Sequence, residues 1–510
     1  MFRKIVKFIT SRLFIVSILI LVQILIILSF VFTLSRNYAF VAGGFWFLSL
    51  IIVVVIVNKR TNPAVKLPWI LLITLLPVFG GLFYMKFGSS KLKKKDEKTL
   101  NEEKEEFKKL YDNDNPVLAT LRSKDPFAAS QASYIHTVTD IPLYNDTEVK
   151  FFALGEEMFE EMIRQLAAAK HYIFMEYFIV APGFVWNTIL DILIHKVAEG
   201  LDVRFMYDDV GSVGTLPYRY DRLLEQNGIH CVAFNPYRAT LKTILHNRDH
   251  RKITVIDGHI AFTGGINLAD EYVNRKERFG HWKDGGVMLK GGAAFPFSLM
   301  FLELWGLYRG MEKNYADYLP VEKRHVDASG FIQPYSDTPL DTEHVGELVY
   351  LNLINQATEY LYLTTPYMII DNELVTALEL AAKRKVDVKI ITPAIPDKWL
   401  VHELTCSYYR ELLEAGVRIY EYTPGFIHAK NFVTDDLIAT VGTINLDFRS
   451  LYHHYECGVW MYGNECIQDI KNDFNRTLKS CSEITLDTIK KTKVIKRLVR
   501  AVFKIFAPLL

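Results

Sequence analysis

The sequence contains no cysteine framework and has a net charge close to zero. Its five cysteines form no CxxC pair and show no His/Cys ligand spacing. This odd, scattered set excludes a disulfide scaffold, gives no support for a zinc site and is typical of reduced thiols. The net charge of +1 over 510 residues argues against a general nucleic-acid binder, because such proteins usually contain a basic domain.

Charged residues are also scarce in the first ninety positions, where three apolar runs occur. The chain is long enough for two or three structural units, and much of its 50% hydrophobic share lies in this segment. The first run can span a bilayer, and it is longer than a signal-peptide core and lacks a cleavage site, so an anchor is favoured over a secretory signal. The runs are Leu13–Leu34, Ala39–Val57 and Leu67–Met85.

The Lys and Arg residues around these runs predict a topology. The N-terminus, with Arg3, Lys4 and Lys7, the second connection and the segment after the third run are all basic. The positive-inside rule therefore places all three on the cytoplasmic side, which three complete spans cannot satisfy. We predict that residues 1–90 form two spans plus a re-entrant or interfacial hairpin broken at Pro77 and Gly80-Gly81. The protein is then multi-pass, with a cytoplasmic catalytic portion.

The rest of the chain divides by composition and pattern. Residues 91–130 are interpreted as a charged linker, whose first part, 91–112, is dense in Lys and Glu and is typical of a solvated helix or linker. Strand-like and helix-like stretches then alternate, in one order that occurs twice, over 131–325 and 326–486. This predicts an α/β fold with parallel-rich sheets flanked by helices. Residues 487–510 form a basic amphipathic helix that suits an anionic membrane surface; the alternative is a helix packed on the body with a solvated basic face.

One motif occurs at equivalent places in the two halves. It has the form His-x-Lys-x4-Asp, and a turn of small residues ending in Asn follows each copy. A single His-x-Lys pair is weak evidence for a site, but two copies with matching turns are hard to obtain by chance. The first copy contains His250, Lys252, Asp257 and Asn267, and the second contains His428, Lys430, Asp435 and Asn445.

The motif carboxylates are poor partners for their own histidines. In a strand, residues two apart share a face, so His250 and Lys252 point the same way while Asp257 falls on the other face or in the closing turn. We expect Asp257 and Asp435 to make structural ion pairs or caps. Carboxylates that arrive after the Asn turns, Asp284 and Glu456, are predicted to orient the imidazoles instead.

Two histidines and two lysines at one interface suit phosphoryl transfer. One imidazole attacks phosphorus to form a phosphohistidine, while the other protonates the leaving alkoxide and later deprotonates the acceptor. The lysines and the two turn asparagines supply positive charge and hydrogen-bond donors for the phosphate oxygens. Because the lysines neutralise the charge, we predict that the reaction needs neither a metal nor a cofactor.

At these residues the chain resembles the phospholipase D superfamily and, within it, the bacterial cardiolipin synthases. This resemblance covers nearly the whole chain, including the third apolar run and the C-terminal Ala507-Pro508-Leu509-Leu510. It implies two pseudo-symmetric repeats, each a mixed sheet flanked by helices, behind N-terminal helices in a bacterial cell membrane. The most specific stretches are Tyr207-Asp208-Asp209-Val210-Gly211-Ser212, Asn247-Arg248-Asp249-His250-Arg251-Lys252, Thr263-Gly264-Gly265-Ile266-Asn267, Gly425-Phe426-Ile427-His428-Ala429-Lys430 and Val441-Gly442-Thr443-Ile444-Asn445-Leu446-Asp447-Phe448-Arg449-Ser450.

The resemblance also implies an activity, which is transfer of a phosphatidyl group between two phosphatidylglycerol molecules to give cardiolipin and glycerol. It makes the His, Lys and Asp positions of both motifs the active-site residues, with His250 as nucleophile and His428 as acid. Departures are Gly265, where the wider superfamily often has Ser, and His453-His454-Tyr455 before Glu456, where an Asn among apolar residues is expected. The alternatives are a hydrolase of the same superfamily, another phosphatidyltransferase and an inactive membrane scaffold.

Overall fold

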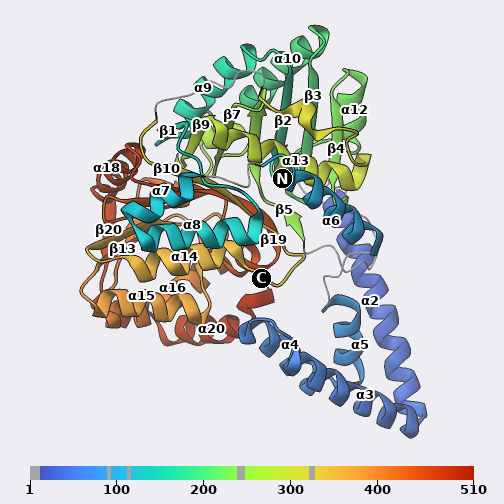
Figure 1. The fold of residues 1–510 in the computed structure, drawn as a ribbon. Coiled ribbons are helices and arrows are strands. Elements are labelled where there is room, and N and C mark those ends of the chain that lie inside the picture. Colours follow the sequence, from blue (N-terminus) through green and yellow to red (C-terminus); the bar gives the residue numbers. More distant parts are fainter. Residues whose placement is uncertain (1–11, 89–93, 112–115, 238–246, 321–327, 510) are drawn as a thin grey trace.

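The computed structural model describes residues 12–88, 94–111, 116–237, 247–320 and 328–509. Two α/β units form the body, and a group of apolar N-terminal helices extends from one side of it (Figure 1). This confirms the predicted fold class. The basic residues Arg3, Lys4, Lys7, Lys91 and Lys93, on which part of the topology prediction depends, lie outside the described ranges.

Each half of the body contains a mixed sheet, and the two sheets share one strand order. The order is β1-β9-β7-β6-β2-β3-β4 in the first and β10-β19-β17-β16-β11-β13-β14-β20 in the second. In both, three parallel strands adjoin antiparallel strands that follow the His-x-Lys motif and the Asn turn. The first sheet comprises β1 (Thr147–Phe152), β2 (Tyr172–Tyr177), β3 (Asp202–Asp208), β4 (His230–Phe234), β6 (Lys252–Ile256), β7 (Ile260–Gly264) and β9 (Gly286–Gly291). The second comprises β10 (Phe331–Asp337), β11 (Tyr360–Thr364), β13 (Asp387–Pro393), β14 (Arg418–Tyr422), β16 (Asn431–Thr434), β17 (Ile438–Gly442), β19 (His454–Tyr462) and β20 (Cys481–Ile484).

The inner faces of the two sheets meet in one shared core, which also contains α13 (Phe295–Arg309) and α18 (Cys466–Leu478), and other helices cover the outer faces. Side chains alternate along β2, so Ile173 and Met175 pack against helices while Phe174 points into a core shared with the second sheet. That core holds Val287 of the first sheet and Val459 of the second, so a hydrophobic core joins the halves, alongside polar contacts such as the buried Lys283–Asp473 ion pair. The helices are α9 (Gly155–Ala167), α10 (Phe184–Ala198), α11 (Asp209–Ser212), α12 (Tyr220–Gln226) and α13 (Phe295–Arg309) in the first half, and α14 (Val345–Gln356), α15 (Asn372–Lys383), α16 (Trp399–Ala415), α17 (Phe448–Tyr452) and α18 (Cys466–Leu478) in the second.

Short strands cross between the halves beside the motif histidines. Strand β5 (Arg248–Asp249) pairs in parallel with His454 and Tyr455 at the start of β19. Strand β15 (Gly425–Ile427) pairs in parallel with β8 (His281–Lys283). The backbone that leads into each motif histidine therefore lies next to the backbone that leads into a carboxylate of the other half.

The predicted charged linker is largely a packed part of the body. Helix α6 (Lys94–Lys108) buries Leu100 and Phe107, which lie two turns apart, against α13. Helices α7 (Pro116–Lys124) and α8 (Pro126–Thr139) pack into the core of the second half, next to α14 and β10. The high charge of this stretch conceals a narrow apolar stripe, and for that reason composition alone indicated a solvated segment.

The N-terminal segment consists of apolar helices. Of the described residues, only α2 (Arg12–Asn37) is long and apolar enough to cross a membrane, over Ser17–Leu34. Helix α3 (Ala39–Asn58) has a shorter apolar stretch, and the third run is divided by Pro77 into α4 (Pro63–Leu75) and α5 (Pro77–Phe87). A Cβ on Gly80 would lie 2.6 Å from the backbone of Ile73, so the glycine permits the close approach of α4 and α5. The arrangement of two spans and a re-entrant hairpin stays a prediction.

The C-terminal helix packs on the body by its basic side, the reverse of the alternative with a solvated basic face, while its docking on a membrane surface stays a prediction. In α20 (Val494–Phe506), Lys496 and Arg500 bind Glu403 of α16, with N–O distances of 2.9 and 2.8 Å, and Lys504 binds Glu411 at 2.9 Å. The apolar side faces outward: Val494, Ile495, Leu498 and Val502 are all exposed. The sequence shows that one side is basic and the other apolar, but not that acidic residues of α16 receive the basic side.

Candidate functional site

The first motif histidine is held by a carboxylate of the other half. His250 Nδ1 lies 2.8 Å from Glu456 Oε1, and its backbone N–H donates to the carbonyl of Tyr455. A carboxylate can only accept, so Nδ1 carries the proton and Nε2 keeps its lone pair. Burial, together with the charges of Lys252 and Lys430, holds the pKa of His250 well below its ordinary value. The imidazole is therefore neutral, as a nucleophile must be.

The second motif histidine is held in the same way from the opposite direction. His428 Nδ1 lies 2.7 Å from Asp284 Oδ2, and its backbone N–H donates to the carbonyl of Lys283. Burial and the charge of Lys430 lower the pKa of His428 to about 4, although Asp284 opposes the shift. The pKa of Asp284 lies below its ordinary value despite burial, because His428 and Lys430 are close. The predicted orienting carboxylates thus contact the imidazoles, each across the interface.

The two motif lysines are buried beside these histidines. Lys252 Nζ donates to the backbone carbonyl of His250, while Lys430 Nζ donates to the carbonyl of His428 and lies 2.9 and 3.1 Å from its two ring nitrogens. Burial lowers the pKa of Lys252 to about 8 and that of Lys430 to about 7. Two lysine side chains that are so poorly solvated are suited to binding an anionic ligand, because its negative charge would favour their protonated forms.

The motif carboxylates lie at the far ends of their strands. Asp257 accepts hydrogen bonds from the backbone N–H groups of Lys170, His171 and Tyr172, at 2.7 to 2.9 Å. Asp435 accepts equivalent bonds from Thr358, Glu359 and Tyr360. Both aspartates also adopt positive φ angles, so each closes the turn after its strand and fixes the start of the neighbouring strand. These contacts agree with the expected structural caps.

The turn asparagines differ from each other. The Asn267 side chain is held at both ends, since Oδ1 accepts from the Ile179 N–H and Nδ2 donates one hydrogen to the Tyr272 hydroxyl. It therefore helps to fix the loop. Asn445 is also buried, but its Oδ1 has no hydrogen-bond partner among the described residues.

The residue at the middle of each turn explains one departure from the expected pattern. A Cβ on Gly265 would lie 2.0 Å from Asp284 Oδ1, so only glycine fits beside that carboxylate. In the second half the equivalent residue is Thr443, whose hydroxyl donates to Glu456 Oε2. The hydroxyl that the first turn lacks is thus present in the second, where it supports the partner of His250.

Buried ion pairs behind the first motif fix its backbone. Arg251 is 1% exposed and its Nε donates to Glu176 Oε1 at 2.7 Å, with Asp249 at 3.5 Å. Arg248 binds Asp208, which also accepts from the Asp249 N–H. The residues flanking His250 therefore hold the strand in place and do not enter the site.

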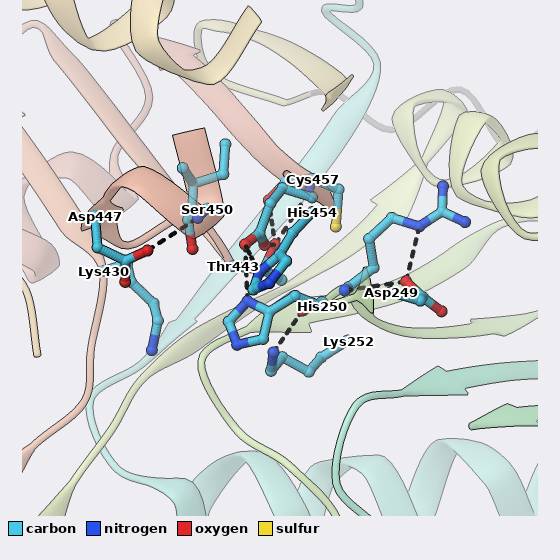
Figure 2. A network of polar contacts seen from close by, with 12 residues as sticks. Asp249, His250, Lys252, Lys430, Thr443, Asp447, Ser450, His454 and Cys457 are labelled. Carbon is cyan, nitrogen blue, oxygen red and sulfur yellow. Dashed lines mark hydrogen bonds and ion pairs between the residues drawn. The ribbon is translucent and has the colours of Figure 1, made fainter. Parts of the chain in front are cut away.

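Sequence reasoning missed one side chain in the site, His454. Figure 2 shows His454 next to His250. The two ring centroids lie 5.5 Å apart, and His454 Nδ1 lies 3.7 Å from Glu456 Oε1. The only signal was its position in place of an expected asparagine, two residues before the orienting carboxylate.

Comparison with known proteins agrees with this arrangement. The family described as "Cardiolipin synthase, PLD-like domain" matches residues 162–278 and 350–478, and "Phospholipase_D-nuclease N-terminal" matches 46–88. A cardiolipin synthase of Halalkalibacterium halodurans is 32% identical over 94% of this chain and 96% of its own length. An uncharacterized protein of Streptococcus mutans is 45% identical over 90% of this chain and 99% of its own length.

The fold is also that of a solved structure. Phosphatidylserine synthase of Haemophilus influenzae superposes with a TM-score of 0.56 at 14% identity, covering 74% of this chain and 98% of that protein. At that identity the likeness concerns the fold alone. The doubled motif, the crossed carboxylates and relatives that align over nearly the full length lead to one assignment. The chain belongs to the cardiolipin synthase family of phospholipase D-like phosphatidyltransferases.

Proposed function

We propose that the protein is a cardiolipin synthase that transfers a phosphatidyl group from one phosphatidylglycerol to another, releasing glycerol. The observation that carries the proposal is the pair of buried, crossed imidazole–carboxylate units flanked by two buried lysines. Cardiolipin synthases about a third identical over most of the chain support this substrate class. The apolar helix α2 favours anchoring of the protein in a membrane, and both substrate molecules are membrane lipids.

In the first step Nε2 of His250 attacks the phosphorus of one phosphatidylglycerol. The bond from phosphorus to the headgroup glycerol oxygen breaks, and His428 protonates that oxygen. The pKa of His428 is near 4 without substrate, and the entering phosphodiester supplies the negative charge that favours its protonated form. Lys252 and Lys430 balance the charge that develops on the phosphate oxygens.

In the second step a hydroxyl of another phosphatidylglycerol attacks the phosphohistidine. His428 removes the hydroxyl proton, the new phosphorus–oxygen bond forms and the phosphorus–nitrogen bond breaks, which restores His250. The products are cardiolipin and glycerol, with no net change in protons. Asp257 and Asp435, placed away from the reacting groups, keep the two strands in register.

The test is to incubate the purified chain with phosphatidylglycerol vesicles and to resolve the lipids. We expect cardiolipin and glycerol in equal amounts, and loss of both in His250→Asn. Phosphatidic acid as the sole product would indicate the hydrolase instead. Peptide mapping of the trapped phosphohistidine should locate the label on His250, whereas label on His428 would reverse the two roles.

A further inference from the structure

His454 places a third imidazole beside the His250–Glu456 pair, and the proposed transfer does not use it (Figure 2). The side chain is 8% exposed, and both of its ring nitrogens lack a hydrogen-bond partner among the described residues. The 3.7 Å between its Nδ1 and Glu456 Oε1 is too long for a hydrogen bond. Buried polar groups are nearly always paired, so an unpaired imidazole facing a carboxylate indicates a missing ligand.

The donor atoms around His454 have the chemistry of a transition-metal site. One ligand atom each from His250, His454 and Glu456 can be chosen so that all three lie within 4.8 Å of one another. Two imidazole nitrogens and one carboxylate oxygen form a typical ligand set for Zn²⁺ with a fourth position open. We propose that His250, His454 and Glu456 bind Zn²⁺, and that the bound ion switches the site off.

The other crossed unit, His428 with Asp284, cannot form an equivalent site. The position two residues before Asp284 is Trp282, which occupies the place that His454 takes before Glu456. The Trp282 ring packs 5.6 Å from the His428 ring and offers no metal ligand. Zinc binding is thus restricted to the imidazole–carboxylate unit that contains the proposed nucleophile, His250.

Inhibition follows from the tautomer of His250. In the metal-free site Nδ1–H donates to Glu456 and Nε2 keeps the lone pair that attacks phosphorus. A metal on Nδ1 takes that nitrogen's lone pair, so the ring proton moves to Nε2 and no nucleophilic lone pair remains there. This consequence rests on the proposed function of His250, whereas the binding of the metal does not.

The described residues contain a competing cluster that serves as a control. His402 and Cys406, one turn apart on α16, lie with Glu421 in a second group of possible ligands. This pair corrects the expectation that no cysteine has a histidine at ligand spacing. The variants to compare are His454→Asn, which removes one proposed ligand, and His402→Asn, which removes an imidazole from the control cluster.

The experiment titrates the purified full-length chain with Co²⁺ as a spectroscopic probe and then displaces the probe with Zn²⁺. We expect visible cobalt bands without a sulfur-to-cobalt charge-transfer band in the wild type and in His402→Asn, and at least about tenfold weaker binding in His454→Asn. Equal binding by His454→Asn, or loss of the bands only in His402→Asn, would overturn the site. If His454→Asn fails to fold, as judged by its melting temperature, His454→Gln replaces it.

The same variants test inhibition. Zn²⁺ should stop cardiolipin formation by the wild type and by His402→Asn, with recovery on adding EDTA, while His454→Asn should need at least about tenfold more Zn²⁺. Zinc binding without inhibition would contradict the switch. If no transferase activity is found in any variant, the proposed function fails, and the cobalt titration still decides whether the metal site exists.

Discussion

Lys430 shows how burial can lower the pKa of a lysine side chain to near neutral pH. Its pKa is lowered to about 7, because burial removes water from the ammonium group and Lys252 adds a like charge, despite nearby carboxylates. Below pH 7 the charged form can bind phosphate, and above pH 7 it is progressively lost. We therefore expect kcat/KM, which reports groups of the free enzyme, to fall about tenfold per pH unit above this pKa. A steady-state pH profile with phosphatidylglycerol checks this.

The matched control keeps the charge. Lys430→Arg carries a guanidinium that stays protonated throughout the accessible range, so its activity is expected to be lower at neutral pH and to lack the decline that begins near pH 7. Only the later decline set by Lys252, whose pKa is lowered to about 8, should remain. An unchanged alkaline limb in Lys430→Arg would show that another group is responsible.

Arg251 illustrates a buried charge that stabilises the fold and does no chemistry. Removing the guanidinium in Arg251→Met leaves Glu176 and Asp249 without their partner in the core. Breaking such a pair costs about 3–5 kcal/mol, so we expect a clearly lower melting temperature. The double variant Arg251→Met with Glu176→Gln should recover part of the loss, because it no longer buries an unpaired glutamate. A single variant as stable as the wild type would contradict the prediction.

At the scale of elements, α20 is the clearest case for a test. Three of its four basic residues, Lys496, Arg500 and Lys504, are paired with Glu403 and Glu411, while Leu498 and its apolar neighbours face outward. The same end of the chain contacts α4 through the 3-10 turn η5 (Ala507–Leu509), so this outer face continues from the apolar N-terminal helices. Each fully buried Leu, Ile or Val side chain contributes about 1.5–3 kcal/mol. We expect α20 to dock on lipid by its apolar face.

Spin labels on reconstituted protein check this expectation. A label at Leu498→Cys should be shielded from a water-soluble relaxation agent in neutral as well as anionic vesicles, and high salt should not release it. Leu223→Cys on α12, also exposed, is the control and should stay accessible. Cys481 is replaced by Ser in both, because the other four cysteines are buried. Release of the Leu498 label by salt would favour electrostatic docking.

The sequence could predict those structural features that neighbouring residues determine, but not those that depend on residues far away along the chain. Strand parity correctly separated His250 from Asp257, because alternation is a property of neighbouring residues. The orientation of α20 and the packing of α6 could not be predicted, since both depend on residues of distant helices, such as Glu403. His454 was visible only as an unexpected residue, because its meaning depends on a ring 5.5 Å away in space and far away in sequence.

At the scale of the whole molecule, the site exists only because each half supplies the carboxylate that contacts the histidine of the other half. Strand β5 pairs with β19 and β15 pairs with β8, and these pairings place Glu456 on His250 and Asp284 on His428. The sequence contained both carboxylates, but each stands closer along the chain to the histidine of its own half. A point mutation in one half should therefore disable the histidine of the other.

A phospholipid substrate with a good leaving group separates the effect of losing Glu456 from the effect of losing Asp284. Phosphatidyl-p-nitrophenol needs no general acid, so formation of the phosphohistidine and the burst of nitrophenol depend on His250 and its partner alone. Glu456→Gln should lower the burst rate about a hundredfold or more, because the imidazole loses its orientation and tautomer. Asp284→Asn should keep the burst and instead slow turnover to cardiolipin, since His428 must still deprotonate the acceptor. If partners acted within each half, Asp284→Asn would abolish the burst and Glu456→Gln would spare it, so rapid-mixing absorbance measurements on the two variants distinguish crossed from uncrossed assembly.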